Sequence, residues 1–288
     1  MNESNQEINI NKTNNDSQNV LVEVKHEQTL FAEPLFNIGG FAVTNSLLVS
    51  WMVVLLIIII FATLKLSIKK IPGKIQGIFE MIFEWFLETF DSVTGDHKKS
   101  LQFFPLVFTF FIFILLNNWF GLLPGVGTVG QVVSEHGEQV LIPFFRGGTA
   151  DLNTTLALAL IAVAASHLFG IFKLGAWKYL NKFINIEAFL EIPKKIMKEP
   201  TIILVNPIKA FVGLVEIVGE IAKVASLSFR LFGNIFAGEV LLASMSAMIA
   251  WLVPIPFMFL EIIVGVIQAL IFAMLTLAFL TINTGEEH

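Results

Sequence analysis

Long stretches without any charged side chain restrict this sequence more than any other feature. No Asp, Glu, Lys or Arg occurs in residues 34–64, 100–134, 152–172, 240–260 and 262–285. A helix needs about 20 apolar residues to cross the ~30 Å hydrocarbon core of a bilayer, and each stretch is long enough. No run alternates apolar and polar residues as the strands of a membrane barrel do, so helices are the only spanning structure left. The sequence therefore predicts an all-α, polytopic membrane protein.

Five membrane elements are expected in a single membrane domain, 41–288, that follows a polar tail, 1–40. Three are ordinary spans and the last two form a long hairpin, with ranges 41–64, 101–123, 152–173, 206–248 and 255–283. A straight helix over 206–248 would be about 64 Å long, roughly twice the hydrocarbon thickness. The usual tilt of about 20° does not absorb that excess, so this hairpin is expected to be strongly tilted and its first helix curved.

The basic residues indicate the orientation. The tail 1–40 holds two and the segment 124–151 holds one, whereas 65–100 and 173–200 hold six each. Because basic residues collect in cytoplasmic loops, the N-terminus is expected outside, and the two lysine-rich segments and the C-terminus inside. The polar tail lacks the short basic start of a cleaved signal peptide, so the first apolar run is interpreted as a retained anchor.

One amphipathic surface helix is predicted over residues 72–92. Its acidic residues recur at helical spacing and form a single stripe of Glu80, Glu84, Glu88 and Asp91. Surface helices that bind anionic lipid are usually basic, so the stripe favours a protein partner. A merely solvated stripe is the alternative.

The predicted helix 206–248 carries polar and ionisable side chains within an apolar stretch. They include Glu216, Glu220, Lys223, Arg230, Asn234 and Glu239. A charged side chain in a bilayer costs roughly 3 kcal/mol on insertion scales, so such residues normally face protein or water and indicate a functional site. The alternative is that they neutralise one another in the core of a bundle.

Helical spacing sorts these residues into two faces. At 100° per residue, Glu216 and Lys223 share the face of Arg230. Small or polar residues complete that face, namely Ser226, Gly233, Asn234, Ala237 and Gly238. Such a face lets another helix approach closely. Glu239 follows Arg230 by nine residues and therefore points the opposite way, toward a separate wet space.

Two residues of the last predicted helix, Glu261 and Gln268, are seven apart and also share a face. With Glu239 they are expected to form a polar path. His167 is interpreted as a packing residue at the inner end of its helix, and a relay is the alternative. Lys223 is expected to line a wet face or to extend toward the interface.

An arginine at such a position acts through its fixed charge. A guanidinium stays protonated at physiological pH, so Arg230 cannot carry a proton. A carboxyl group buried in lipid can have a pKa of about 8–9. A guanidinium about 4 Å away attracts the carboxylate by about 4 kcal/mol at an effective dielectric of about 20, which lowers that pKa by about 3. Arg230 can therefore unload a passing carboxyl group and block a cation from leaking between two aqueous inlets.

The segment Ser226–Glu239, SLSFRLFGNIFAGE, closely resembles the signature of subunit a of F-type ATP synthases. The resemblance covers about 41–172 and 200–288, is weak in the loop 174–199 and does not include the tail. Further matches are Pro72-Gly73-Lys74 with Gln76 and Glu80, Thr149 to Asn153, Gln268 to Phe272, and the closing Glu286-Glu287-His288.

The resemblance implies a proton-channel stator beside a rotating ring of c subunits. Arg230 matches the family arginine, which would force each passing ring carboxyl group to release its proton and would block proton leak. Asn234 and Gln268 match polar neighbours of that arginine. Positions associated with two aqueous half-channels are matched by Glu216, Glu239 and Glu261, the last of which is His in some members. Asp151 matches an acidic residue near the outer mouth.

The same resemblance implies a place in the bacterial plasma (inner) membrane and a role without catalysis by the chain itself. Its implied partners are the c ring, the b-subunit peripheral stalk, membrane lipid and, indirectly, the F1 sector. The choice between H⁺ and Na⁺ belongs to the ring. No cofactor, metal, nucleotide or nucleic-acid site is expected, since the sequence has no cysteine, no phosphate-loop motif and a net charge of only −5.

Two other interpretations stay open. A secondary transporter could bind a small anion at Arg230, but transporters of that kind usually show inverted repeats with paired broken helices, and none is visible. A purely structural scaffold would leave the intramembrane polar residues unexplained.

Overall fold

The computed structural model describes residues 29–69, 73–123, 125–127, 129–135, 138–177, 179, 202–248 and 252–285. Its helices are α2 (Asn45–Ser67), α3 (Lys74–Thr94), α4 (His97–Gly121), α5 (Leu152–Leu174), α8 (Ile202–Met248) and α9 (Pro254–Thr284), with a 3₁₀ turn η1 (Gly148–Ala150). Most of the predicted tail, most of the loop 174–199 and the closing residues 286–288 lie outside the described part, so the predictions made for them are not addressed.

The expectation of a mostly helical, polytopic membrane protein is confirmed. Four described helices, α2, α4, α5 and α9, are long and apolar enough to cross a membrane. The fifth predicted element corresponds to α8. It differs from the other four because it carries several ionisable side chains along its length. It runs for 47 residues, so at 1.5 Å per residue it is about 70 Å long.

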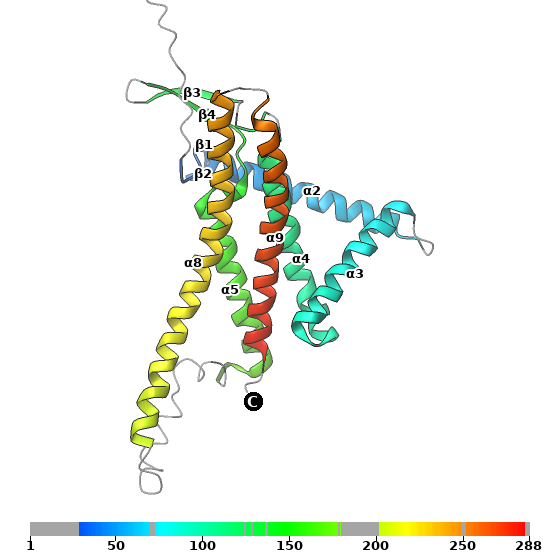
Figure 1. The fold of residues 1–288 in the computed structure, drawn as a ribbon, viewed down its shortest axis with the longest axis vertical. Helices are drawn as coiled ribbons and strands as arrows, with labels where there is room; N and C mark the ends of the chain where they lie inside the picture. Colours follow the sequence, from blue (N-terminus) through cyan, green and yellow to red (C-terminus); the bar gives the residue numbers. More distant parts are fainter. Residues whose placement is uncertain are drawn as a thin grey trace, which may run out of the picture.

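Two short antiparallel hairpins add to the predicted helices (Figure 1). Strands β1 (Pro34–Ile38) and β2 (Phe41–Thr44) turn through Gly39 and Gly40, whose φ angles of 58° and 90° suit a tight two-residue loop. Strands β3 (Gly130–Glu135) and β4 (Glu138–Pro143) form the second hairpin. The first hairpin corrects the predicted start of the first span from 41 to Asn45, where the Thr44 side chain caps α2 by accepting from the Leu47 N–H.

Helix α3 corresponds to the predicted surface helix but starts two residues later, at Lys74. Gln76 ties its first turn to the end of α2, because its amide both accepts from Lys69 N (3.1 Å) and donates to Lys69 O (3.2 Å). Glu80, Glu84 and Glu88 of the acidic stripe are exposed. Helix α3 is terminated by Gly95, the residue after its last turn, which adopts the left-handed conformation at φ 67°.

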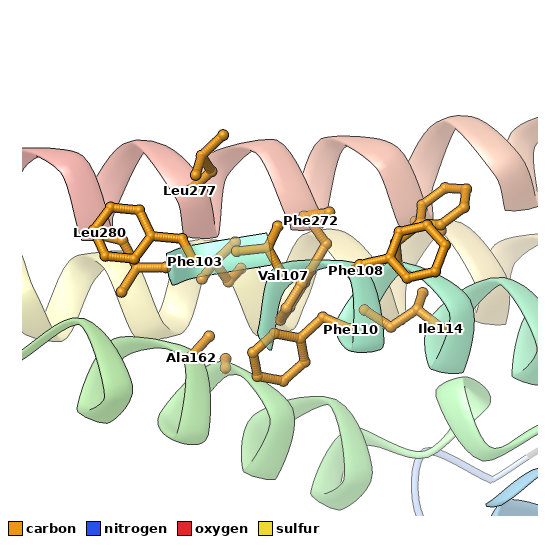
Figure 2. Packing of buried hydrophobic residues seen from close by; sticks show 14 of the residues in the cluster. Phe103, Val107, Phe108, Phe110, Ile114, Ala162, Phe272, Leu277 and Leu280 are labelled. Atoms are coloured by element: carbon orange, nitrogen blue, oxygen red, sulfur yellow. The ribbon is translucent and has the colours of Figure 1, made fainter. Parts of the chain in front are cut away.

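The core lies where α9 packs against both α4 and α5. Phe103, Val107 and Ile114 of α4 are at most 1% exposed, and Phe110 of α4 meets Phe272 of α9 with ring centroids 5.6 Å apart. Figure 2 shows these side chains between the two neighbouring helices, with Ala162 of α5 facing them. In an apolar solvent helix association depends on such packing rather than on hydrophobic transfer, so these contacts hold the bundle together.

Helix α2 runs across the direction that α4, α5, α8 and α9 share, rather than along it (Figure 1). Much of its circumference is apolar and uncovered, and Trp51, Leu55 and Ile58 are more than half exposed. A helix with apolar residues on an uncovered surface is suited to contact with lipid.

A buried polar network joins α2, α4 and α9 to the turn η1. Thr149 donates to the Asn118 side chain (2.7 Å), and Asn118 donates to the Gly265 carbonyl of α9 (3.1 Å). Ser50 of α2 donates to the Asn117 side chain (3.4 Å), and a Cβ on Gly148 would overlap both. These bonds fix the loop that precedes α5.

We expect Phe272→Ala to lower the free energy of unfolding by about 3–5 kcal/mol, because it leaves a cavity that rigid helices fill only partly. The measurement is thermal unfolding of the detergent-solubilised protein, followed by the loss of helical circular dichroism. Phe172→Ala is the matched control, since that side chain is 85% exposed and should leave the midpoint unchanged. Equal midpoints for the two variants would contradict the assigned core.

Candidate functional site

Arg230 lies on a face of α8 that the rest of the described chain leaves open. Arg230, Ser226, Asn234 and Ala237 are all exposed, and a Cβ added to Gly233 would meet nothing within 4 Å. The Arg230 guanidinium donates to the Ser226 hydroxyl, four residues earlier, at 3.2 Å. The arginine therefore has small and polar neighbours along its own helix and open space in front of it.

Helix α8 also exposes apolar side chains on the other sides of its circumference. Val218, Ile221 and Phe229 are each at least 60% exposed. Among the residues that the structure describes, no carboxylate lies within 4 Å of Arg230. An ionised guanidinium on an apolar membrane surface is costly, so this face needs a partner that supplies negative charge or water.

Two residues assigned to the arginine face by spacing lie elsewhere. Gly238 is buried, and a Cβ on it would overlap the Glu261 carboxylate of α9. Lys223 is only 26% exposed and turns toward Glu220 and the ring of Phe279. An α-helix repeats every 3.6 residues, so residues seven or eight apart drift off a common line and can meet different neighbours.

A polar row connects the open face with the interface between α8 and α9. Asn234 donates to the Gln268 side chain at 2.5 Å, and Gln268 is 2% exposed. Glu261, seven residues before Gln268, is 8% exposed and lies against Gly238. Both α9 residues therefore face the interior of the bundle.

Glu239 points away from Arg230, as its spacing predicts, and pairs with Arg146 of the loop before α5. The Arg146 Nε lies 3.2 Å from both carboxylate oxygens and Nη2 lies 2.9 Å from Oε2. Arg146 also donates to the backbone carbonyls of Thr29 (2.8 Å) and Phe31 (3.2 Å), and it is 4% exposed. This pair joins the N-terminal segment, the loop and α8.

The sequence interpretation missed Arg146 as a partner. It is one of only two arginines in the sequence and the single basic residue of the segment 124–151. The signal that could have indicated a partner was its isolation. A single basic residue stands in a segment predicted to lie outside the membrane, and no neighbouring residue in the sequence accounts for its charge. Its partner Glu239 is 93 residues away, so no spacing rule connects them.

Asp151 caps α5. Its carboxylate accepts from the backbone N–H groups of Asn153 and Thr154 (both 3.3 Å), from the Thr154 hydroxyl (3.0 Å) and from Ala32 N (3.2 Å). It is 4% exposed. In the structure this residue fixes the start of α5 and the N-terminal segment, and its place near the outer mouth stays a prediction.

A second group of ionisable side chains lies near the C-terminal end of α5. His167 Nδ1 is 2.5 Å from the Tyr179 hydroxyl, and its Nε2 is 3.4 Å from Glu220 Oε2. Glu220 Oε1 accepts from the Lys223 ammonium at 2.7 Å. Burial, followed by the charges of Glu220 and Glu216, raises the pKa of Tyr179 to about 12. Glu216 therefore acts on this group rather than on Arg230.

Known proteins resemble this chain over nearly its whole length. A family model described as ATP synthase A chain matches residues 47–281. ATP synthase subunit a of Syntrophobacter fumaroxidans is 30% identical over 271 residues, covering 94% of this chain and 97% of that protein. The subunit from Legionella pneumophila strain Corby is 30% identical over 256 residues, 88% and 92% of the two chains. A sodium ion specific subunit a from Propionigenium modestum is 30% identical over 269 residues, 93% and 83%.

We expect Arg146→Gln to lower the free energy of unfolding by more than the loss of an exposed ion pair does. Removing one partner of a fully buried pair costs about 3–5 kcal/mol. The cost here should be smaller, because 29% of the Glu239 side chain is exposed. Thermal unfolding of Arg146→Gln, Glu239→Gln and the double variant should show that the double costs less than the sum. Asp91→Asn is the control, as its pair with His97 is exposed. Additive costs would contradict the pairing.

Tyr179 is the sole tyrosine of the sequence, so its ionisation can be followed without interference. The ¹³Cζ resonance of the labelled, detergent-solubilised protein should titrate near 12, above the ordinary value of 10.0. The folded protein then holds this proton more tightly than the unfolded chain, so stability should fall as pH rises between those two values. Glu220→Gln should move the titration downward. A midpoint at the ordinary value would contradict the buried position.

Proposed function

We propose a function from the premise that this chain belongs to the ATP synthase A chain family, as the match over residues 47–281 and the relatives establish. The chain is accordingly a multi-pass membrane protein of ion transport, of the kind found in bacterial ATP synthases. The finer proposal is that it is the stator of a proton channel, which offers a rotating c ring two half-channels separated by Arg230.

The open face around Arg230 carries this proposal. Its guanidinium is exposed among apolar side chains, and the described residues bring no carboxylate to it. A ring carboxyl group that arrives at about 4 Å would gain about 4 kcal/mol on ionising at an effective dielectric of about 20. That gain lowers its pKa by about 3, which is enough to release a proton that lipid would otherwise keep bound.

The positions along α8 suit two separate paths. Glu239 follows Arg230 by about 13 Å along the helix axis and Glu216 precedes it by about 21 Å, at 1.5 Å per residue. We assign Asn234, Gln268, Glu261 and Glu239 to one half-channel and Glu216 to the other. The fixed positive charge between them opposes the direct passage of a cation, so an ion has to travel with the ring.

A steep tilt of α8 and α9 agrees with their length and with the course of α2. If α2 crosses the bilayer close to its normal, the bundle that runs across α2 lies far from that normal (Figure 1). A helix of about 70 Å then stays within a hydrocarbon core of about 30 Å. It would present a long face to the ring rather than a single crossing point.

The remaining partners follow from the same proposal. The exposed acidic stripe of Glu80, Glu84 and Glu88 on α3 is suited to a protein partner such as the b-subunit stalk. The F1 sector would act only indirectly. We propose the predicted orientation as well, with the N-terminus outside and the ends of α5 and α9 toward the cytoplasm.

Arg230→Ala should abolish ATP-driven proton pumping by inverted vesicles that contain the whole complex, because nothing then forces the ring carboxyl group to ionise. Acidification is followed with a pH-sensitive dye, and assembly by the amount of ring that co-purifies. Arg230→Lys should retain part of the activity, since it keeps the charge but loses the guanidinium geometry. Lys98→Ala, which removes an exposed cation from α4, is the control.

Normal pumping by Arg230→Ala would overturn the proposed function. Pumping that moves Na⁺ and no protons would overturn the assignment of the ion and leave the stator role intact.

A further inference from the structure

The group formed by His167, Tyr179, Glu220 and Lys223 lies outside the path assigned above. Its members come from α5, from the residues just after α5, and from α8. His167 precedes the end of α5 by seven residues, or about 10 Å. Glu220 precedes Arg230 by ten residues, or about 15 Å. The group therefore occupies the space between the arginine and the end of the bundle at which α5 and α9 finish (Figure 1).

The group is built into the protein rather than scattered on its surface. The Glu220 side chain is 12% exposed, and the side chains of His167 and Lys223 are 26% exposed. Tyr179 is 3% exposed, and its ring packs directly against Gly170. A Cβ at position 170 would overlap the tyrosine ring and the Asn283 carbonyl. The Lys223 ammonium lies 5.1 Å from the ring centroid of Phe279.

The hydrogen bonds have a direction. The raised pKa of Tyr179 keeps its hydroxyl protonated, so this hydroxyl can donate to His167 Nδ1. A neutral imidazole that accepts at Nδ1 carries its proton on Nε2. That Nε2 faces Glu220 Oε2 at 3.4 Å, while Lys223 holds the other carboxylate oxygen. The imidazole thus stands between a hydroxyl that orients it and a carboxylate that can take the Nε2 proton once the ring is protonated at both nitrogens.

We propose that His167 and Glu220 exchange protons between the Arg230 region and the water at this end of the bundle, with Tyr179 and Lys223 as positioning residues. The proposal rests on the proton-channel function proposed above and adds a relay to the half-channel of Glu216. It selects the relay over the packing role that the sequence favoured for His167.

The transfer is a proton exchange without redox chemistry. A proton taken up at Nδ1 makes the ring an imidazolium and reverses its hydrogen bond, so that Nδ1–H donates to the Tyr179 oxygen. The Nε2–H bond then breaks as an O–H bond forms on Glu220 Oε2, and the ring keeps its proton on Nδ1. The products are a neutral imidazole and a neutral carboxyl group, and the charge of Lys223 remains. The reverse transfer restores the ion pair between Glu220 and Lys223 and returns the proton to His167.

Among the residues that the structure describes, the ionisable groups placed around His167 come from α8 and from the segment after α5. Helix α8 contributes Glu220, with Lys223 beside it, and Tyr179 of the segment after α5 is itself influenced by Glu216. On α5 itself Lys173 follows six residues later, and α9 has no ionisable side chain from Ile262 to Gly285.

The test measures passive proton flux through the complete membrane sector in inverted vesicles stripped of F1, driven by a potassium diffusion potential. Flux is recorded while the pH of the outer bath is varied from 5 to 8, the range in which imidazoles change charge. His167→Gln keeps a polar side chain at this position that cannot take up a proton. It should reduce flux at least about fivefold and flatten its dependence on bath pH. Glu220→Gln should act in the same direction.

Tyr179→Phe keeps the ring packed against Gly170 and removes only the hydroxyl, so it tests orientation in a variant that should still fold. It should lower flux about twofold. Ser166→Ala is the control, as it removes a neighbouring hydrogen bond from Asn283 and should leave the pH profile unchanged. Co-purification of the ring verifies assembly of each variant.

Unchanged flux in His167→Gln, or a loss by the same factor at every pH, would overturn the relay. If His167→Gln does not assemble, unchanged flux in Tyr179→Phe would overturn it. In either case a loss of pumping in Arg230→Ala would still support the stator function, whereas normal pumping there would remove the premise of both proposals.

Discussion

An ionised arginine on an open face of a helix within a membrane protein is the constraint on which the rest of this structure depends. Arg230 has a hydroxyl beside it and no carboxylate within reach among the described residues. Placing such a charge against lipid costs several kcal/mol, so the face is stable only against a partner that brings negative charge or water. Ser226, Gly233 and Ala237 keep the surface small there, which lets another helix come close. The fold leaves this face uncovered because α5 and α9 pack against other sides of α8.

Two other carboxylates of α8 are paired away from that face. Glu239 is held by the buried Arg146, and Glu220 by Lys223. Asn234 reaches from the open face to the interior, through Gln268. This division means that a carboxylate of the same chain does not neutralise Arg230, while the polar groups on either side of it remain available to water. The sequence left open the alternative that these charged residues neutralise one another. Within the described residues this holds for the pairs Glu239–Arg146 and Glu220–Lys223 and not for Arg230.

Sequence patterns predicted what depends on local periodicity and composition. The apolar runs located the membrane helices, and the nine-residue spacing placed Glu239 opposite Arg230. They failed where distant segments meet: the pair of Arg146 with Glu239 joins residues 93 apart, and His167 finds Glu220 on another helix. Gly39 and Gly40 form the turn of a hairpin that the sequence analysis did not predict. A short apolar run fits a strand as well as a helix, so its composition does not distinguish the two. Lys223 and Gly238 do not lie on the predicted face. They are seven and eight residues from Arg230, and the rotation of the helix over that distance is enough to turn them toward other neighbours.

The central claim concerns the distance between Arg230 and a carboxyl group of another chain. An experimental structure of the assembled complex, with this subunit in place beside its ring, measures that distance directly. The account predicts that the open face of α8 lies against the ring and that a ring carboxyl group comes within about 4 Å of the Arg230 guanidinium, where their attraction is about 4 kcal/mol. A structure in which lipid or a different chain covers this face, and no ring carboxyl group can approach Arg230 at any rotational position, would contradict it.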